Sequence, residues 1–460
     1  MDPRPETRPE PPHQEQLRLP WSKTSRIFPR VVIRPLQSFL RTEAAGGILL
    51  LIAAAAALAW ANLWPGSYDA VWHTELTARL GRWTLTEDLQ HWVNDALMAI
   101  FFFIVGLEIK RELVSGELRD PRSAALPAFG ALGGMVLPAA LFLAFTFGGP
   151  GARGWGIPMA TDIAFAVGVV AILGRHLPSS IRVFLLALAI VDDIGAILVI
   201  AIFYSTGISW AALGAATGLL ALIVVLQRAQ VRHIAVYVVL GSGVWLAVFV
   251  SGVHATIAGV VLGLLTPARP FQRPNIVSRE ARRVAGETED DPELADRDAH
   301  HWLGLAAMAR ETISPLARLQ HALHPWTSYV IVPLFALANA GVNLGGGAIG
   351  DALTSGITLG IVAGLVVGKI AGISFFAWVA TRFGLARLPA DARWVEVVGV
   401  SAVAGIGFTV SLFIAGLAFS EAELLAEAKV GILAGSIVAG SVGGLLLWLG
   451  RRRAYSMPAD

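Results

Sequence analysis

Two adjacent aspartates lie in the middle of a long apolar stretch, Leu188-Ala-Ile-Val-Asp-Asp-Ile-Gly-Ala196. The apolar run around Asp192 and Asp193 extends from about residue 180 to 204, longer than the roughly 20 residues that a helix needs to cross a bilayer. An ionisable side chain at mid-membrane is costly and is usually retained for function. The stretch therefore predicts a membrane-spanning helix with a functional pair of carboxylates.

The composition of the whole chain also indicates a membrane protein. Hydrophobic residues make up 55% of the 460 residues and charged residues 15%, against roughly 25% charged residues in soluble proteins. The mean hydropathy is +0.65. These values exclude a soluble multidomain enzyme, a disordered protein and a nucleic-acid-binding protein. The sequence pI of 9.1 fits the one-sided placement of basic residues in membrane proteins.

The residue types also limit the chemistry. There are no cysteines, which excludes disulfides, iron–sulfur clusters and thiolate catalysis. The histidines show no paired spacing typical of a structural metal site, so we expect neither a resident metal nor another cofactor. The 48 glycines are expected where helices pack closely in lipid.

Twelve apolar stretches predict an all-α polytopic membrane protein with twelve spans. The expected spans are 44–64, 90–112, 124–147, 156–174, 180–204, 208–227, 231–250, 252–267, 325–344, 353–380, 395–419 and 428–449. If the N-terminus is cytoplasmic, only four basic residues fall on the far side, namely Arg79, Arg82, Arg153 and Lys429. The positive-inside rule then predicts that both termini face the cytoplasm.

The remaining segments divide the chain further. We expect a Pro/Arg-rich cytoplasmic tail over 1–41, a membrane domain over 42–450 and a short cytoplasmic tail over 451–460. Within the membrane domain, 268–324 is a long cytoplasmic loop with an acidic run. In the first external loop, residues 76–86 alternate around Gly81 and predict a small β-hairpin.

Two of the expected spans are interrupted. Pro158 precedes Thr161 and Asp162 in the fourth span, where a proline removes a backbone donor and breaks a helix. The eleventh span carries a parallel interruption at Gly405 and Gly407, in Gly405-Ile-Gly-Phe-Thr409. Two interrupted spans in corresponding halves of a chain are the best sequence indication of a transporter site. Asp162 would neutralise facing positive helix ends there, and Lys369 of the tenth span facing negative ends.

The adjacent carboxylates suggest the chemistry of this site. At roughly 6 Å and an effective dielectric near 20, the repulsion between Asp192 and Asp193 is about 2.8 kcal/mol. Uptake of a proton or binding of a cation relieves this repulsion, and hard cations such as Na⁺ prefer oxygen ligands. A group that holds either a proton or a cation is the core of cation/proton exchange.

Several stretches resemble the NhaA-type sodium/proton antiporter family. They cover about residues 40–450, in order: Trp92-Val-Asn-Asp-Ala-Leu-Met98, Val105-Gly-Leu-Glu-Ile-Lys-Arg-Glu-Leu113, Ala160-Thr-Asp-Ile-Ala-Phe-Ala166, Leu188-Ala-Ile-Val-Asp-Asp-Ile-Gly-Ala196, Ser251-Gly-Val-His-Ala-Thr-Ile-Ala-Gly259, Phe335-Ala-Leu-Ala-Asn-Ala-Gly341 and Gly405-Ile-Gly-Phe-Thr409. The resemblance implies a twelve-helix fold in the bacterial inner membrane, in which spans three to five mirror ten to twelve and spans four and eleven cross as broken helices.

The resemblance also implies a function. Cytoplasmic Na⁺ or Li⁺ would be exchanged for external protons, with more protons than sodium ions per cycle, in support of pH and sodium homeostasis. Asp192 and Asp193 would form the ion and proton site, Lys369 would partner Asp192, and Thr161 and Asp162 would complete the crossing. The family's pH-response positions match Glu108, Arg111, Glu112 and His254. The hairpin near 76–86 resembles the family's homodimer contact.

The sequence departs from the family at one position, and two other functions compete. Family members carry a glutamate in the Arg-Leu-Glu-His stretch before span nine, where this chain has Gln320. A sodium-coupled organic-anion symporter of similar fold would need more hydroxyl and amide ligands than spans four and five supply. An intramembrane aspartyl protease would need two aspartates sharing a proton, such as Asp162 and Asp193, and the Lys369 cation opposes that arrangement.

Overall fold

The computed structural model describes residues 45–80, 83–173, 178–205, 207–287, 295–343, 345, 350, 354–389 and 391–455. The expected N-terminal tail over 1–41 lies outside these residues. So do the last five residues of the expected C-terminal tail and the middle of the acidic run in the long loop.

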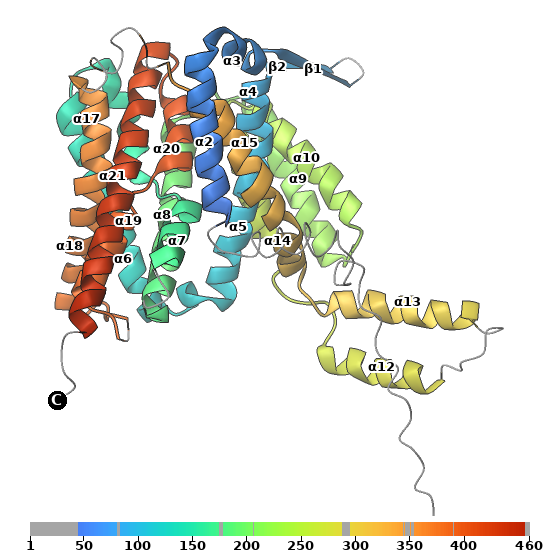
Figure 1. Ribbon diagram of the computed structural model, residues 1–460. Helices are drawn as coiled ribbons and strands as arrows, with labels where there is room; N and C mark the ends of the chain where they lie inside the picture. Colours follow the sequence, from blue (N-terminus) through green and yellow to red (C-terminus); the bar gives the residue numbers. More distant parts are fainter. Residues whose placement is uncertain are drawn as a thin grey trace, which may run out of the picture.

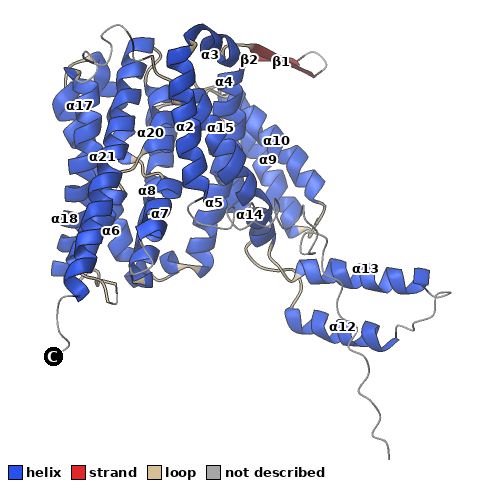
Figure 2. Cartoon of the chain, viewed as in Figure 1, coloured by secondary structure: helices blue, strands red, loops and turns tan. Residues whose placement is uncertain are grey.

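Helices dominate the described chain (Figure 2). The first half contains α2 (Ala45–Leu63), α3 (Pro65–Trp72), α4 (Leu89–Trp92), η3 (Val93–Leu97), α5 (Met98–Ser115), η4 (Glu117–Arg119), α6 (Pro121–Thr146), η5 (Pro150–Met159), α7 (Ile163–Leu173), α8 (Ser179–Phe203) and α9 (Trp210–Arg228). The second half contains α10 (Ile234–Val250), α11 (Thr256–Leu265), α12 (Pro274–Glu287), α13 (Ala295–Glu311), α14 (Pro315–Trp326), η8 (Thr327–Ile331), α15 (Val332–Asn339), α17 (Gly356–Ala363), η9 (Gly364–Gly368), α18 (Lys369–Arg382), α19 (Trp394–Val403), α20 (Phe408–Ala418) and α21 (Ala422–Tyr455).

The predicted all-α membrane architecture is confirmed in outline. Seven helices of the described chain are long and apolar enough to cross a membrane, or nine if each of two bent helix pairs is one span. The long ones are Ala45–Leu63, Leu89–Ser115, Pro121–Thr146, Ser179–Phe203, Trp210–Arg228, Gly356–Arg382 and Ala422–Leu449. The expected seventh and eighth spans are the shorter apolar helices α10 and α11. The expected ninth span falls on η8 and α15, which continue from α14.

The predicted hairpin is also present. Strands β1 (Glu75–Leu80) and β2 (Trp83–Asp88) pair antiparallel, with Leu80 opposite Trp83 and Thr77 opposite Thr86. The two threonine hydroxyls lie 3.0 Å apart. In Figure 1 the hairpin projects from one end of the helix bundle, and α12 and α13 lie at the other end. We refer to these as the hairpin end and the α12–α13 end.

Glycines bring pairs of helices into close contact inside the bundle. A Cβ atom on Gly133 of α6 would lie 2.2 Å from the carbonyl oxygen of Gly372 of α18, and a Cβ on Gly372 would lie 2.1 Å from that of Gly133. The same applies to α5 and α11, where a Cβ on Gly259 would lie 2.1 Å from the carbonyl oxygen of Ala99. Because no side chain fits at these contacts, the backbones of the helices touch, as expected for helices that pack in lipid.

Candidate functional site

Both interrupted spans are broken helices. The axes of η5 and α7 meet at 45° around residues 160–162, and those of α19 and α20 meet at 46° around residues 404–407. Pro158 lies in the 3₁₀ segment η5, so the helix already departs from α geometry before the break. A Cβ atom on Gly405 would lie 2.1 Å from the carbonyl oxygen of Leu365, and one on Gly407 would lie 3.1 Å from that of Ala160. Because these two residues have no side chain, the backbone of the second break can approach the backbone of Leu365 and Ala160 closely.

Backbone and side-chain hydrogen bonds join the two breaks directly. The Asp162 N–H donates to the carbonyl oxygen of Ile406 (2.6 Å), and the Thr161 hydroxyl donates to that of Ala404 (2.7 Å). The Ser411 hydroxyl donates to the carbonyl oxygen of Ile157 (2.7 Å). Breaking a helix leaves backbone groups without partners, and a buried unpaired group is costly. Here each break supplies partners for the other.

The Asp162 carboxylate lies at the N-termini of two helices. One oxygen accepts a hydrogen bond from the Phe165 N–H in the first turn of α7 (3.0 Å). The other accepts from the N–H (3.1 Å) and the hydroxyl (2.6 Å) of Thr409 at the start of α20. Asp162 is only 2% exposed. A negative charge at a helix N-terminus is stabilised by the helix dipole, and the Asp162 carboxylate is placed to interact with both helix ends.

The two adjacent aspartates of α8 face different neighbours. Asp192 is 2% exposed and forms an ion pair with the fully buried Lys369 of α18, with 2.6 Å between its Oδ2 atom and Nζ. The same ammonium group donates to the Thr161 hydroxyl (3.1 Å). Asp193 is 5% exposed and interacts electrostatically with Asp192, Glu108 and Lys369. Residues from α8, α18 and the first break therefore meet in one buried site.

This site has spare ligand capacity. The Oδ1 atoms of Asp192 and Asp193 are buried and have no hydrogen-bond partner among the described residues. A buried carboxylate oxygen without a partner is costly, and either a proton or a small cation would satisfy it. In the described part of the chain, no cluster of three or more His, Asp or Glu side chains is arranged to hold a metal ion. The donor set thus suits a cation that binds transiently through a few carboxylate and hydroxyl oxygens.

Three of the four expected pH-response residues gather at the α12–α13 end of α5. The Glu108 side chain lies within interaction range of the side-chain amide of Gln320 of α14, and Arg111 donates to the Gln320 side-chain oxygen (3.3 Å). Arg111 also lies 3.7 Å from Glu112. Gln320, which the sequence singles out as a departure from the family, is therefore the residue that joins Glu108 to Arg111.

His254 lies apart from this group. Parallel packing of α11 on α5 places Gly259 beside Ala99 and Gly263 beside Gly106, so His254, before α11, lies toward the hairpin end of α5. Its Nε2 atom is 2.9 Å from the carbonyl oxygen of Tyr204, at the end of α8. Any influence of His254 on the buried site must therefore take a different route from that of Glu108.

Two residues with structural roles at the site are missing from the sequence prediction. Thr409 closes the quoted Gly405–Thr409 motif, and its position directly after the break was an available signal for a helix-capping contact with Asp162. Tyr204 had no such signal. Its hydroxyl donates to the carbonyl oxygen of Arg153 (2.9 Å) and accepts from the Gly156 N–H (3.2 Å), which attaches η5 to the end of α8.

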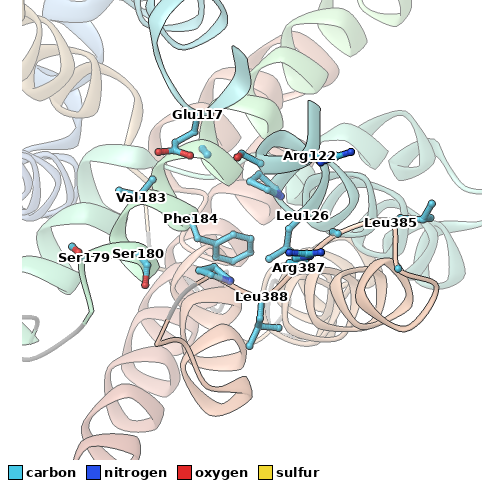
Figure 3. A pocket seen from close by; sticks show the side chains of 16 residues that line it. Glu117, Arg122, Leu126, Ser179, Ser180, Val183, Phe184, Leu385, Arg387 and Leu388 are labelled. Carbon is cyan, nitrogen blue, oxygen red and sulfur yellow. The ribbon is translucent and has the colours of Figure 1, made fainter. Parts of the chain in front are cut away.

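A cavity of about 910 Å³ opens at the α12–α13 end, between the start of α6, the start of α8 and the α18–α19 connection. Figure 3 shows the side chains of Glu117, Arg122 and Arg387 around it. A smaller cavity of about 340 Å³ adjoins it and shares Ala187 as a lining residue. Ala187 precedes Asp192 by five residues on α8, which is about 7.5 Å along a helix axis. The cavity therefore leads from the α12–α13 end toward the buried carboxylates.

Comparison with known proteins agrees with this geometry. The family model described as "Na+/H+ antiporter 1" matches residues 37–447. A protein of Anaeromyxobacter sp. (strain Fw109-5) named Na(+)/H(+) antiporter NhaA is 49% identical over 430 residues, 93% of this chain and 94% of that protein. The Na(+)/H(+) antiporter NhaA 2 of Sorangium cellulosum (strain So ce56) is 48% identical over 425 residues, 91% of this chain and 90% of that protein. A Koribacter versatilis (strain Ellin345) protein named Na(+)/H(+) antiporter NhaA is 46% identical over 431 residues, 93% and 94% of the two chains.

The fold and the site define a multi-pass membrane transporter with a buried carboxylate site at two broken helices. The chain belongs to the Na+/H+ antiporter 1 family. The resemblance that the sequence motifs indicate is thereby confirmed.

Proposed function

We propose that this protein exchanges Na⁺, or Li⁺, for protons across a bacterial inner membrane. The main support is the pair of buried carboxylates, of which one oxygen each has no partner among the described residues. The relatives named as Na+/H+ antiporters cover more than nine-tenths of the chain. The two candidate cargoes compete for the same oxygens, because a protonated carboxyl group cannot neutralise Na⁺ and a Na⁺-bound carboxylate cannot hold a proton. Such competition couples the two fluxes.

We assign the ion and proton site to Asp193 and Asp192, with Lys369 and Thr161 as neighbours and Asp162 as the charge that compensates the two helix ends. Lys369 balances one carboxylate, so one net negative charge remains for Na⁺. The broken helices at Pro158, Gly405 and Gly407 provide the surrounding backbone. The exposure of the larger cavity at the α12–α13 end supports Na⁺ entry from that end. We assign Glu108, Arg111, Glu112 and His254 to the response to pH.

We further propose the finer architecture. Twelve spans place both termini in the cytoplasm, with the hairpin end outside. In the inverted repeat, α6, the η5–α7 pair and α8 correspond to α17–α18, the α19–α20 pair and α21. The nearly equal bends of 45° and 46° support this correspondence. The external hairpin is proposed as the homodimer contact of a protein embedded in the lipid bilayer, and the domain limits at residues 42 and 450 remain predictions.

The geometry also bears on the competing functions. Asp162 is held by three hydrogen-bond donors at the two helix ends, so it is not arranged to share a proton with Asp193 as a protease requires. The ion pair between Asp192 and Lys369 favours exchange over symport, because it leaves one of the two adjacent carboxylates, that of Asp193, available to a cation or a proton.

Replacement of Asp193 by asparagine tests the ion site. We expect Asp193→Asn to abolish Na⁺-driven proton movement in everted membrane vesicles, measured with a pH-gradient dye, because an amide keeps the size but cannot ionise. Asp391→Asn in the α18–α19 connection is the matched control and should exchange normally. Exchange by the Asp193→Asn protein at the wild-type rate would contradict the assignment. A symporter or a protease would leave the pH gradient intact when Na⁺ is added.

The proton excess can be tested separately. If two protons enter for each Na⁺ that leaves, one net positive charge moves inward, and each 100 mV contributes about 2.3 kcal/mol. We expect Na⁺ export from liposomes to accelerate with an inside-negative potential set by K⁺ and valinomycin at equal pH on both sides. A flux that does not respond to the potential would indicate one-for-one exchange.

A further inference from the structure

Helices α12 and α13 form a pair that runs across the axis of the bundle. Figure 1 shows both helices extending sideways from the α12–α13 end, beyond α9 and α10, instead of continuing along the bundle. α12 spans Pro274–Glu287 and α13 spans Ala295–Glu311. If the bundle crosses a membrane, a helix in this orientation lies parallel to the membrane plane.

The base of this pair is fixed at the level where two spans end. Both carboxylate oxygens of Glu311, the last residue of α13, lie 2.7 Å from Nη1 of Arg232. The Glu311 carbonyl oxygen accepts from the N–H groups of Phe271 and Gln272 (both 3.1 Å), and the Arg232 guanidinium lies 5.1 Å from the centre of the Phe271 ring. Arg232 separates α9, which ends at Arg228, from α10, which begins at Ile234. The root of α13 is therefore at the depth of the lipid headgroups.

The two helices bury one apolar strip and leave another exposed. Val277 and Val284 of α12 and Leu305 of α13 are buried in the described structure, and α12 packs on α13. Helical geometry places Leu303 of α13 about 160° from Leu305, and Leu303 is 70% exposed. The flanking Trp302 is 44% exposed. We define the α13 outer face as Trp302, Leu303, Ala306 and Ala307, all exposed.

We propose that the α13 outer face rests on the lipid surface of the membrane that the bundle crosses. Three observations select lipid as the occupant: the helix lies across the bundle axis, its root is fixed at the depth where α9 and α10 end, and its exposed face carries a tryptophan, a residue enriched at membrane interfaces. Helices that lie in the interface bury one apolar face in the headgroup and acyl boundary. A helix of 17 residues covers about 25 Å of that surface.

The charge pattern indicates which force holds the helix there. Arg310 lies near the root, and the sequence Asp296-Arg297-Asp298 forms the first turn of α13, at the far end. Because both signs of charge occur along the helix, contact with lipid depends on the apolar face more than on anionic headgroups. The same contact is therefore expected in bilayers with and without anionic lipid.

The absence of cysteine from the sequence makes the test direct, because a single introduced cysteine carries the only spin label. Leu303→Cys and Ala307→Cys place the label on the α13 outer face, and Ser278→Cys on the exposed side of α12 is the control. We expect labels at 303 and 307 in nanodiscs to collide severalfold more often with oxygen than with a water-soluble nickel chelate. The label at 278 should show the reverse, and nanodiscs of neutral lipid should give the same result.

Two outcomes would overturn the proposal. Equal preference for the nickel chelate at 303, 307 and 278 would show that the pair projects into water. Low collision rates with both reagents, together with spin–spin broadening between two copies, would show that protein covers the face. The measurement reports on lipid contact whether or not the same protein exchanges Na⁺ for protons, so its failure is distinguishable from failure of the transport proposal.

Discussion

The two broken helices are alike in shape but contribute different kinds of chemical group to the site. The first break supplies side chains, namely Thr161 and the buried carboxylate of Asp162. The second broken helix supplies uncharged groups, namely the backbone carbonyls of Ala404 and Ile406 and the hydroxyls of Thr409 and Ser411, together with space at its glycines. The first broken helix therefore carries the negative charge of Asp162, and the second supplies the groups that pack against it and bind it.

The same division extends to the helices beside the breaks. Acidic groups of the site come from the first half of the chain, with Asp192 and Asp193 on α8, whereas the ammonium group of Lys369 comes from α18 in the second half. The Lys369–Asp192 and Thr161–Ala404 contacts join the halves. Two halves of similar bend thus produce a site that is asymmetric in charge, which a transporter of a single small cation requires.

The largest effect is expected from removing Lys369, the buried cation through which the site joins the halves. Lys369→Ala leaves Asp192 buried without its partner, and loss of one member of a buried ion pair typically costs about 3–5 kcal/mol. The measurement is thermal stability in detergent across pH. At acidic pH part of the loss should be recovered, because Asp192 can then take up a proton.

The double variant Lys369→Ala/Asp192→Asn provides the control for this prediction. It removes both charges, so its stability should exceed that of Lys369→Ala at alkaline pH. If Lys369→Ala alone is as stable as the wild type at alkaline pH, the ion pair does not stabilise the protein, and the proposed join between the halves is wrong.

The next largest effect tests the second break as a surface. In Gly405→Ala the new Cβ would lie 2.1 Å from the carbonyl oxygen of Leu365, so the backbone of the break must shift, at a typical cost of about 1–3 kcal/mol for overpacking. We expect lower thermal stability and slower exchange. Gly416→Ala on α20 is the matched control, since nothing lies within 4 Å of its added Cβ. Equal behaviour of the two variants would mean that the second break tolerates side chains.

Asp162→Asn tests the charge placed at the first break. The carboxylate accepts three hydrogen bonds at two helix ends, whereas asparagine keeps one acceptor oxygen and turns an NH₂ group toward a donor. Leaving a buried donor unpaired costs about 1–3 kcal/mol. Exchange should weaken and the melting temperature should fall, with Asp391→Asn as the exposed control. Full stability of Asp162→Asn would show that the helix ends do not need this charge.

Features of the fold and of the candidate site can be predicted from the sequence when their physical cause lies within a short stretch of residues. The apolar runs, the hairpin around Gly81 and the interruptions near Pro158 and Gly405 are local, and each has a physical cause within a few residues. The contacts of Lys369 with Thr161, about two hundred residues away in sequence, depend on how α18 packs on α6, which no local pattern encodes. The family resemblance implied the Asp192–Lys369 partnership, but not the capping of two helices by Asp162.

The segment 268–324, between α11 and the end of α14, shows how little composition alone reveals about local structure. Its acidic run predicted only a cytoplasmic loop, whereas the described part contains most of α14 and the mutually packed helices α12 and α13. The apolar residues that pack them together, Val277, Val284 and Leu305, are spread over the loop, and the acidic run between them dominates its composition. The tail of α21 is a similar case, because the helix continues through Tyr455 and the first residues of the expected C-terminal tail are helical.

The smallest effect concerns how the first broken helix is held at its outer end. Tyr204→Phe removes the hydroxyl that joins Arg153 and Gly156 of η5 to α8, at about 1 kcal/mol of stability for one hydrogen bond. If the loosened η5 lets Thr161 and Asp162 leave their positions in part of the molecules, the apparent affinity for Na⁺ falls by that fraction. A shift of about 1 kcal/mol corresponds to a rise in KM of at most roughly fivefold, while the maximal rate changes little. Tyr237→Phe is the matched control, because the Tyr237 hydroxyl also donates to a carbonyl oxygen, that of Val231 (2.8 Å), but lies on α10, away from η5.

A similar loss of stability in both variants, with a higher KM only in Tyr204→Phe, would show that the attachment of η5 to Tyr204 positions the first break. An unchanged KM in Tyr204→Phe would mean that the second break alone holds it.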